Sequence, residues 1–361
     1  MAKVGFGPSA FRRLAVAFLF LVPLVAAVPG AAPRAGAQDE ISVTMVTDTA
    51  GLGDQNFNDA VREGLAQAET DFGISVTVLE SQEQADYVPN LEAGAEDSDL
   101  TVAVGFLLVD AVTDVSARFP DSQFVLIDGT PAEERENVLG VLFREQEGAF
   151  LAGIVAARTT QTGKVGILGG QDIPPVERYE VGFVAGFRTA AGPDAEDPVI
   201  TYTDTFGDPA LGKEQSLALY DQDADIVFAI AGATGIGAFE AAKEKGEGVW
   251  VIAADKDQSQ LGPEFQLCTA TKSLTAAVYE AVRSVVEGGF EGGVLDVGVA
   301  EEGTGLETTP GNFVPEDVLA EVELYRQAII AGEFTVPATR DEMEGFTPPD
   351  VGTPAAGTPE A

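Results

Sequence analysis

Short apolar runs of strand length alternate with helical patterns along almost the whole chain, and this alternation constrains the fold more than any other feature. Residues 41–46 form a β-branched run suited to a buried parallel strand, and Ala60, Leu65 and Ala68 then recur at roughly helical spacing. Further strand-length runs occupy residues 76–79, 100–104, 123–127 and 138–143, with helical patterns at 87–95 and 109–118. Such alternation predicts a parallel sheet covered by helices.

The same scheme repeats in the second half of the chain. A helical pattern at 145–158 carries a small-residue face and marks the entry to a second lobe. Strand-like runs then occupy residues 164–168, 199–202, 225–230, 249–253 and 266–271, and helical patterns occupy 176–190, 210–220, 235–245, 275–287 and 315–331. A chain of 361 residues with 45% hydrophobic content is long enough for two cores. We therefore predict an α/β protein of two doubly wound, Rossmann-like lobes.

The two ends of the chain read as processing or linker segments. Arg12 and Arg13 precede an apolar stretch at 14–28 that is too short to span a membrane, and residues 35–37 form a small-residue cleavage site. Residues 1–37 are thus interpreted as a signal peptide, with an uncleaved signal anchor as the alternative. Residues 347–361 are rich in Pro, Gly and Thr and are expected to be disordered.

Composition excludes several classes of function. The net charge of −39 would repel nucleic acid and anionic membrane surfaces, so no nucleic-acid partner is expected. The chain contains no histidine, which removes Ser-His-Asp triads and the commonest zinc ligand sets. Its one cysteine, Cys268, lies far from the cleavage region, so no cysteine is expected to carry a lipid there. Neither a cofactor nor a metal ion is expected.

Polar and aromatic residues follow the predicted strands in both halves. The carboxyl ends of parallel strands share one edge of a sheet, so these residues from two facing lobes are expected to line one crevice. The candidates are Asp48, Phe57, Asn58, Asp128, Phe206, Gly232, Asp255 and Lys272. Taken singly, the aspartates are equally typical of helix caps or turns, and the phenylalanines of a core.

The glycine-spaced segment at 232–237 invites comparison with a dinucleotide-binding fingerprint. It follows a predicted strand and precedes a helix, but no acidic residue ends the next strand in the expected register. Nicotinamide cofactor binding is therefore disfavoured.

Several longer motifs together resemble one family, over about residues 42–334. They are Asp54-Gln55-Asn56-Phe57-Asn58, Ile127-Asp128, Gln146-Glu147-Gly148-Ala149-Phe150-Leu151-Ala152-Gly153, Thr162-Gly163-Lys164-Val165-Gly166-Ile167-Leu168-Gly169-Gly170, Gly182-Phe183-Val184-Ala185-Gly186, Phe206-Gly207-Asp208-Pro209 and Ala254-Asp255-Lys256-Asp257-Gln258. The chain is similar to the basic membrane protein family, or purine nucleoside receptor A-like group, of type I ABC-transporter substrate-binding proteins.

The resemblance implies two lobes that close like a clamshell on a purine nucleoside such as inosine, guanosine or adenosine and deliver it to permease subunits. Phe57 and Phe206 match the family's base-stacking phenylalanines. The base-recognising positions fall on Asp48, Asn58 and Asp128, and the ribose contacts on Gly232, Asp255 and Lys272. Phe183 is a further candidate for the cavity wall. Many family members carry a lipidated N-terminal cysteine, which this sequence lacks.

These observations predict an exported, monomeric binding protein at the periplasmic or extracellular face of the membrane, and not an enzyme. The expected lobes are residues 38–143 plus about 258–290, and 144–257 plus about 291–335, with hinges near Phe143, Asp255 and Gly298. Three alternatives stay open: a receptor for a sugar or another small polar metabolite, a sensory module, and a secreted hydrolase that uses two of Asp48, Asp128 and Asp255.

Overall fold

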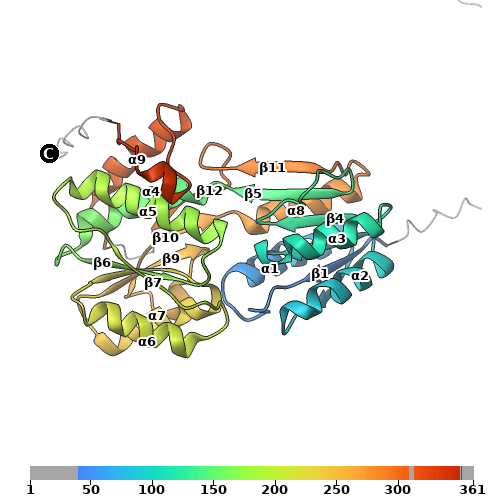
Figure 1. The fold of residues 1–361 in the computed structure, drawn as a ribbon, viewed down its shortest axis with the longest axis horizontal. Coiled ribbons are helices and arrows are strands. Elements are labelled where there is room, and N and C mark those ends of the chain that lie inside the picture. The colour runs from blue at the N-terminus through green and yellow to red at the C-terminus, as the bar shows by residue number, and fades with distance from the viewer. Residues whose placement is uncertain (1–39, 309–312, 350, 352–361) are drawn as a thin grey trace, which may run out of the picture. The chain divides into compact units, whose positions relative to one another are not determined.

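Two six-stranded sheets organise the chain in the computed structural model, which describes residues 40–308, 313–349 and 351 (Figure 1). The expected signal peptide lies outside the described residues, as does most of the expected disordered tail. Each sheet and its covering helices form one lobe, and the prediction of two doubly wound α/β lobes is confirmed. Among the described residues, no helix has the length and apolar composition to cross a membrane.

The first lobe contains β1 (Ser42–Val46), α1 (Phe57–Phe72), β2 (Ser75–Leu79), α2 (Tyr87–Asp97), β3 (Leu100–Val104), α3 (Val109–Arg118), β4 (Gln123–Ile127), β5 (Val138–Phe143), α8 (Leu274–Val286) and β11 (Gly293–Val297). Its strand order is β11-β5-β4-β3-β1-β2, and every pairing is parallel. Short 3₁₀ turns lie at Gln84–Asp86 and Phe106–Leu108.

The second lobe contains α4 (Glu145–Thr159), β6 (Val165–Gly169), α5 (Pro174–Ala191), β7 (Val199–Tyr202), α6 (Pro209–Tyr220), β8 (Ile226–Ile230), α7 (Ile236–Lys245), β9 (Trp250–Asp255), β10 (Gln266–Lys272), β12 (Thr304–Thr308), α9 (Glu316–Ile330) and α10 (Arg340–Met343). Its strand order, β12-β10-β9-β8-β6-β7, repeats that of the first lobe, except that β12 runs antiparallel to β10. Short 3₁₀ turns lie at Gly232–Gly235 and Ser259–Leu261.

The chain passes between the sheets at three points. These are the β5 to α4 junction, the β10 to α8 junction and the segment from β11 to β12. Two of them coincide with the expected crossovers near Phe143 and Gly298. The middle one follows Lys272 rather than Asp255, because β10 pairs with β9 in the second sheet.

The lobe boundaries therefore differ from those expected. Residues 266–272 were assigned to the first lobe and belong to the second, and residues 293–297 were assigned to the second lobe and belong to the first. A strand that is buried on both faces, such as β10, fits either sheet, so its sequence does not specify its partner. β11 is a mostly exposed edge strand without apolar alternation, so the glycine-rich passage gave no strand signal.

Each sheet has its topological switch point between the second and third strands from one edge, where the strand order reverses. In the first sheet this lies between β1 and β3, and in the second between β6 and β8. Ligands in open α/β sheets bind outside the carboxyl ends of strands at such points. A ligand site is therefore expected at the carboxyl ends of these four strands.

The second-lobe core depends on an unusually close contact between α4 and α5. A Cβ added at Gly186 would lie 1.9 Å from the carbonyl oxygen of Phe150, and one at Gly153 would lie 2.2 Å from that of Phe183. Only glycine permits this approach of the two backbones. Phe150 and Phe183, both fully buried, fill the space on either side.

Gly186→Ala is expected to destabilise the protein by about 1–3 kcal/mol or more, because the added methyl group meets backbone atoms that cannot rotate away. Urea unfolding measures this. The matched control is Gly235→Ala, where φ is −62° and the nearest atom to an added Cβ is 3.5 Å away. Equal stability of the two variants would contradict the packing argument.

Candidate ligand-binding site

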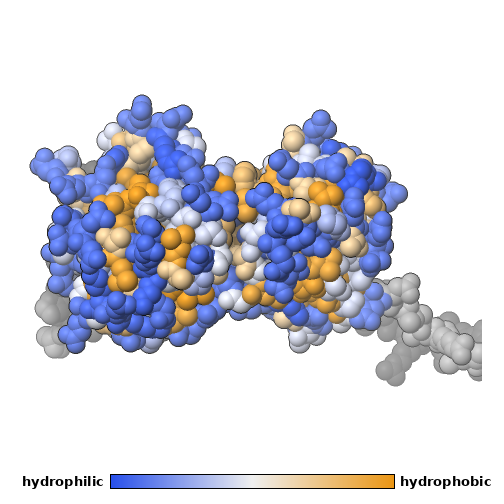
Figure 2. Space-filling view, turned by 60° about the horizontal axis from the view of Figure 1, so that its bottom comes forward, coloured by the Kyte–Doolittle hydropathy of each residue, from blue (hydrophilic) through white to orange (hydrophobic). Residues whose placement is uncertain are grey.

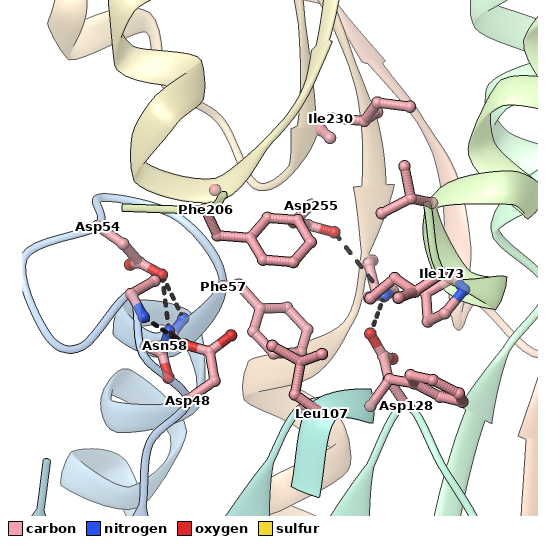
Figure 3. Close-up of a pocket in the computed structure, with 18 of the residues that line it drawn as sticks. Asp48, Asp54, Phe57, Asn58, Leu107, Asp128, Ile173, Phe206, Ile230 and Asp255 are labelled. Atoms are coloured by element: carbon pink, nitrogen blue, oxygen red, sulfur yellow. Dashed lines mark hydrogen bonds and ion pairs between the residues drawn. The ribbon is translucent and has the colours of Figure 1, made fainter. Parts of the chain in front are cut away.

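A cavity opens between the lobes at the carboxyl ends of both sheets (Figure 3). The space free of protein atoms is about 580 Å³, including its open mouth. Its lining residues are Asp48, Ala50, Asp54, Phe57, Asn58, Gly105, Phe106, Leu107, Asp128, Ile173, Pro175, Val176, Tyr179, Phe206, Ile230, Gly232, Ala254, Asp255 and Lys272. All eight residues predicted to share a crevice line this cavity, whereas Phe183, the further candidate for its wall, does not.

Phe183 lies in the core of the second lobe instead. Its side chain is fully buried, and its ring stacks on that of Phe228 at 4.8 Å between centroids. The face of α5 that carries it packs on the sheet, whereas the cavity is reached from the first turns of that helix, by Val176 and Tyr179. The expected place of Phe183 in the cavity wall is therefore corrected.

Two phenylalanines project into the cavity from opposite lobes (Figure 3). Phe57 opens α1, and Phe206 lies in the loop before α6. Gly170 lets the Phe206 ring lie against backbone, since a Cβ there would be 2.2 Å from that ring, and Gly105 lies in ordinary contact distance of the Phe57 ring, at 3.5 Å from an added Cβ. The cavity is thus bounded by two flat apolar faces.

Asp54 holds the loop that carries Phe57 and Asn58. Its carboxylate accepts hydrogen bonds from the backbone N–H groups of Asn56 (2.9 Å), Asn58 (2.7 Å) and Asp59 (3.1 Å). These are free donors at the start of α1, where a negative charge is favoured. Asp54 therefore anchors the helix start, and the side chains beside it take fixed directions.

Asn58 and Asp48 form a polar pair beside Phe57. The Asn58 amide donates from Nδ2 to Asp48 Oδ1 (2.9 Å) and to Asp54 Oδ2 (3.1 Å). Asp48 Oδ1 also accepts from the backbone N–H of Ala50, at 3.0 Å. Burial raises the pKa of Asp48 to about 6, although both hydrogen bonds oppose that rise. Figure 3 shows the Asp48 carboxylate directed toward the cavity.

A buried cluster of charges lies on the other side of the cavity. The Lys272 ammonium, at the end of β10, lies 2.7 Å from Asp128 Oδ2, 2.9 Å from Glu145 Oε1 and 3.9 Å from Asp255 Oδ1. Asp128 follows β4 in the first lobe, whereas Lys272 and Asp255 belong to strands of the second. The side chain of Lys272 is only 2% exposed. One ammonium thus joins carboxylates from both lobes.

The protonation of the cluster follows from burial and from its two cations. Burial raises the pKa of Asp128 to about 6, and Lys272 only partly offsets this. Burial also opposes ionisation of Glu145, but Lys272 and Arg178, which both contact it, outweigh burial and lower its pKa. Burial would lower the pKa of Lys272, yet its three carboxylates raise it. Lys272 and Glu145 are therefore charged at neutral pH.

Aromatic rings enclose the same ammonium. Its nitrogen lies 5.2 Å from the ring centroids of Phe57 and Phe143 and 5.6 Å from that of Tyr179. Such rings attract a desolvated cation. The Tyr179 hydroxyl also donates to Asp255 Oδ1 at 2.9 Å. Lys272 is thereby held in one position rather than extended toward solvent.

Asp128 and Asp255 occupy corresponding positions in the two lobes, directly after or at the end of β4 and β9. Both have φ of +65°, in the left-handed region that non-glycine residues seldom adopt. Residues in such conformations concentrate at functional sites, where surrounding structure holds them. In each lobe this conformation turns a carboxylate into the cavity.

The buried polar atoms of the cavity lining that have no hydrogen-bond partner are acceptors. Asn58 Oδ1 and Asp128 Oδ1 are buried and have no hydrogen-bond partner. Among the described residues, no group of three or more Cys, His, Asp or Glu side chains is arranged to hold a metal ion. The arrangement suits a ligand with N–H and O–H donors and a flat apolar face, and it disfavours an anion.

Sequence reasoning missed several residues of the site. Glu145 and Arg178 complete the charge cluster, Asp54 orders the loop, and Tyr179 lines the wall. Asp54 and Glu145 both precede or open predicted helices, which is where a cap is expected anyway. Their participation depends on how the lobes meet, and no spacing in the sequence encodes that.

Comparisons with known proteins identify the family of this chain. The profile described as "ABC transporter substrate-binding protein PnrA-like" matches residues 41–340. The chain belongs to this family. A crystal structure of an ABC transporter solute-binding protein from Aeropyrum pernix K1 superposes with a TM-score of 0.78 at 33% identity, covering 84% of this chain and 95% of that one.

PnrA-like relatives are found in bacteria and archaea. A CD4+ T-cell-stimulating antigen of Listeria monocytogenes is 34% identical over 319 residues, covering 82% of this chain and 88% of its own length. The ABC transporter nucleoside-binding protein BmpA of Lactococcus lactis subsp. cremoris is 30% identical over 320 residues, covering 83% and 90%. Membership of this family of substrate-binding proteins implies a small-molecule ligand and permease partners.

Lys272→Met is expected to destabilise the protein by about 3–5 kcal/mol, because removing one partner of a buried ion pair leaves uncompensated charge. Lys243→Met is the matched control: Lys243 pairs with Glu240 at 2.9 Å on the surface, where such pairs contribute about 0–1 kcal/mol. Denaturant unfolding compares the two. A Lys272→Met variant as stable as the control would refute the proposed importance of the cluster.

Proposed function

We propose that this protein is an extracytoplasmic receptor that binds a purine nucleoside between its lobes and presents it to an ABC-transporter permease. The observation that carries the proposal is the pairing of Phe57 and Phe206 from opposite lobes, flanked by carboxylates at both ends of the cavity. A purine offers two faces for stacking, and each offset aromatic contact adds about 0.5–1.5 kcal/mol beyond area burial.

The two polar groups of the cavity suit the two parts of a nucleoside. Asp48 and Asn58 form one group and would accept from N–H donors at the edge of the base. Asp255 and Lys272 form the other, with Gly232 nearby in the cavity lining, and would hold the ribose hydroxyls. Asp128, expected at the base, contacts Lys272 and is assigned here to the ribose side.

The expected export of the chain and the names of its relatives agree with this role. Relatives from Pyrococcus abyssi and Pyrococcus horikoshii are named lipoproteins, and the Lactococcus relative is named a nucleoside-binding protein. In this chain, two arginines followed by an apolar stretch precede the first lobe, as in exported proteins. The face drawn in Figure 2 is hydrophilic over most of its outline, with apolar patches between.

Two contacts between the lobes at the rim of the cavity also support closure. Lys256, in the loop after β9, pairs with Glu63 of α1 at 2.5 Å. Gln258 donates from Nε2 to the backbone carbonyl of Gln55 at 3.3 Å. These contacts join the second lobe to the helix and loop that carry Phe57. A ligand that favours this closed arrangement would shift the population toward it.

A thermal-shift screen tests the ligand class. Inosine, guanosine and adenosine are compared with ribose and glucose, since a ligand at 100 times its dissociation constant stabilises by roughly 2.7 kcal/mol. Stabilisation by nucleosides alone is expected. Stabilisation by the free sugars instead would replace the proposed ligand with a sugar, and release of free base from inosine would indicate a hydrolase.

Phe206→Ala is expected to weaken inosine binding at least about tenfold, because the base loses one stacking face. The thermal unfolding of the ligand-free protein should change little, since Phe206 is only partly buried. Calorimetry measures the affinity. Phe313→Ala, at a position 45% exposed, serves as the control and should bind normally. Unaltered affinity in Phe206→Ala would remove the stacking role.

Inosine binding is expected to weaken by up to about tenfold between pH 7 and pH 5, because N–H donors of the base bind the ionised Asp48 carboxylate more strongly than the protonated acid, and the pKa of Asp48 is about 6. The stability of the ligand-free protein should change in the opposite direction. A carboxyl whose pKa is raised on folding binds more protons in the folded state between about pH 4 and 6, so this group stabilises the fold as pH falls.

Calorimetry at several pH values and urea unfolding of the ligand-free protein measure these two trends. Asp48→Asn should reduce the pH dependence of affinity, and Asp128, whose pKa is also about 6, would account for what is left. An affinity that is constant from pH 7 to pH 5 in the wild-type protein would exclude an ionised Asp48 as a ligand contact.

A further inference from the structure

Arg340, the first residue of α10, connects separate parts of the second lobe although it lies outside the cavity lining. Its guanidinium donates to both carboxylate oxygens of Glu180, at 2.8 Å each, and to both oxygens of Asp172, at 3.2 and 2.9 Å. It also donates to the hydroxyl of Tyr202 at 2.8 Å. One planar side chain thus holds two carboxylates and a phenol at once.

Each of these partners adjoins a segment of the cavity wall. Asp172 immediately precedes Ile173, and Glu180 follows Tyr179; Ile173 and Tyr179 both line the cavity. Tyr202 ends β7, and the chain continues from it into the loop that carries Phe206. Arg340 therefore ties together the loop before α5 and the loop after β7, which supply much of the second-lobe wall.

The Tyr202 ring and the Phe206 ring lie against consecutive glycines. A Cβ at Gly169 would be 2.7 Å from the Tyr202 ring, and a Cβ at Gly170 would be 2.2 Å from the Phe206 ring. The loop between the two rings is held by the N–H of Thr203 to the carbonyl of Gly169 and by the N–H of Asp204 to that of Gly170, at 3.0 and 2.9 Å. A displacement of Tyr202 would therefore also move Phe206, because only a short, tightly packed segment separates the two residues.

Without the Arg340 guanidinium, the carboxylates of Glu180 and Asp172 would repel each other. Glu180 is 5% exposed, and without Arg340 it would be a buried carboxylate beside Asp172. Separation of the two segments would relieve that repulsion, because Asp172 is exposed and its loop lies at the surface. The wall of the cavity would then be in its binding geometry for only part of the time.

We propose that Arg340 is a positioning residue for ligand binding: it fixes the second-lobe wall of the cavity by holding Asp172, Glu180 and Tyr202 together. The role rests on the proposed ligand site, but it is a statement about this wall rather than about which molecule binds. A lysine at this position would keep one ion pair, but it lacks the planar fork that reaches all three partners.

Arg340→Gln is compared with wild type and with Arg158→Gln as the matched control. Arg158 makes a bidentate pair with Glu321 in the same lobe, with both bonds at 2.8 Å, and neither residue lines the cavity. Calorimetry with inosine measures affinity. If the cavity wall has its binding geometry only about a tenth of the time in Arg340→Gln, the dissociation constant for inosine rises about tenfold. Arg158→Gln should bind inosine as wild type does.

Hydrogen exchange of the ligand-free proteins gives a readout that needs no ligand. Amides at 171–176 and 203–207 should exchange faster in Arg340→Gln and unchanged in Arg158→Gln. Arg340→Lys should recover part of the lost thermal stability while its loop exchange and its affinity stay impaired, which separates positioning from general stabilisation.

The inference is overturned if Arg340→Gln leaves exchange in both loops at the wild-type rate, or if its loss of stability is spread evenly over the second lobe. Failure of wild-type protein to bind any nucleoside would count against the proposed function alone, because the exchange comparison would still decide whether Arg340 fixes the wall.

Discussion

The buried ammonium of Lys272 is the interaction on which the rest of the site depends. It meets Asp128 from the first lobe and Glu145 and Asp255 from the second, with its side chain 2% exposed. Desolvated charges are tolerated only when they are paired and well placed. The cluster therefore requires the lobes to meet in one arrangement at the back of the cavity, and it leaves a surplus of acceptor oxygens for a ligand.

Repetition of one fold in both lobes explains why the cavity is so symmetric in its chemistry. Each lobe contributes one phenylalanine and one aspartate in the left-handed conformation at the end of a central strand, namely Phe57 with Asp128 and Phe206 with Asp255. Gly170 allows the Phe206 ring to approach the backbone of the second lobe. The two aspartates thus come from equivalent strands, β4 and β9, whereas Phe57 follows β1 and Phe206 follows the edge strand β7.

Much of this arrangement is predictable from the sequence, because strand and helix periodicity is local and residues after parallel strands converge at one edge of a sheet. That reasoning brought Asp48, Phe206, Asp255 and the others to one cavity. The same reasoning failed for residues whose contacts depend on how separate strands and helices pack against one another. The residues of β10 and β11 belong to the lobes opposite to those expected, Phe183 faces the core, and Glu145 and Arg340 act through partners more than 30 residues away.

The central claim is that this acceptor-rich cavity takes a neutral nucleoside and excludes an anion of the same shape. Parallel calorimetric titrations with inosine and inosine 5′-monophosphate test it most directly, since the two differ only in the phosphate. Like charges placed together cost several kcal/mol, so the account predicts that inosine binds and that the monophosphate binds at least about a hundredfold more weakly. Equal binding of the two, or preference for the monophosphate, would contradict it.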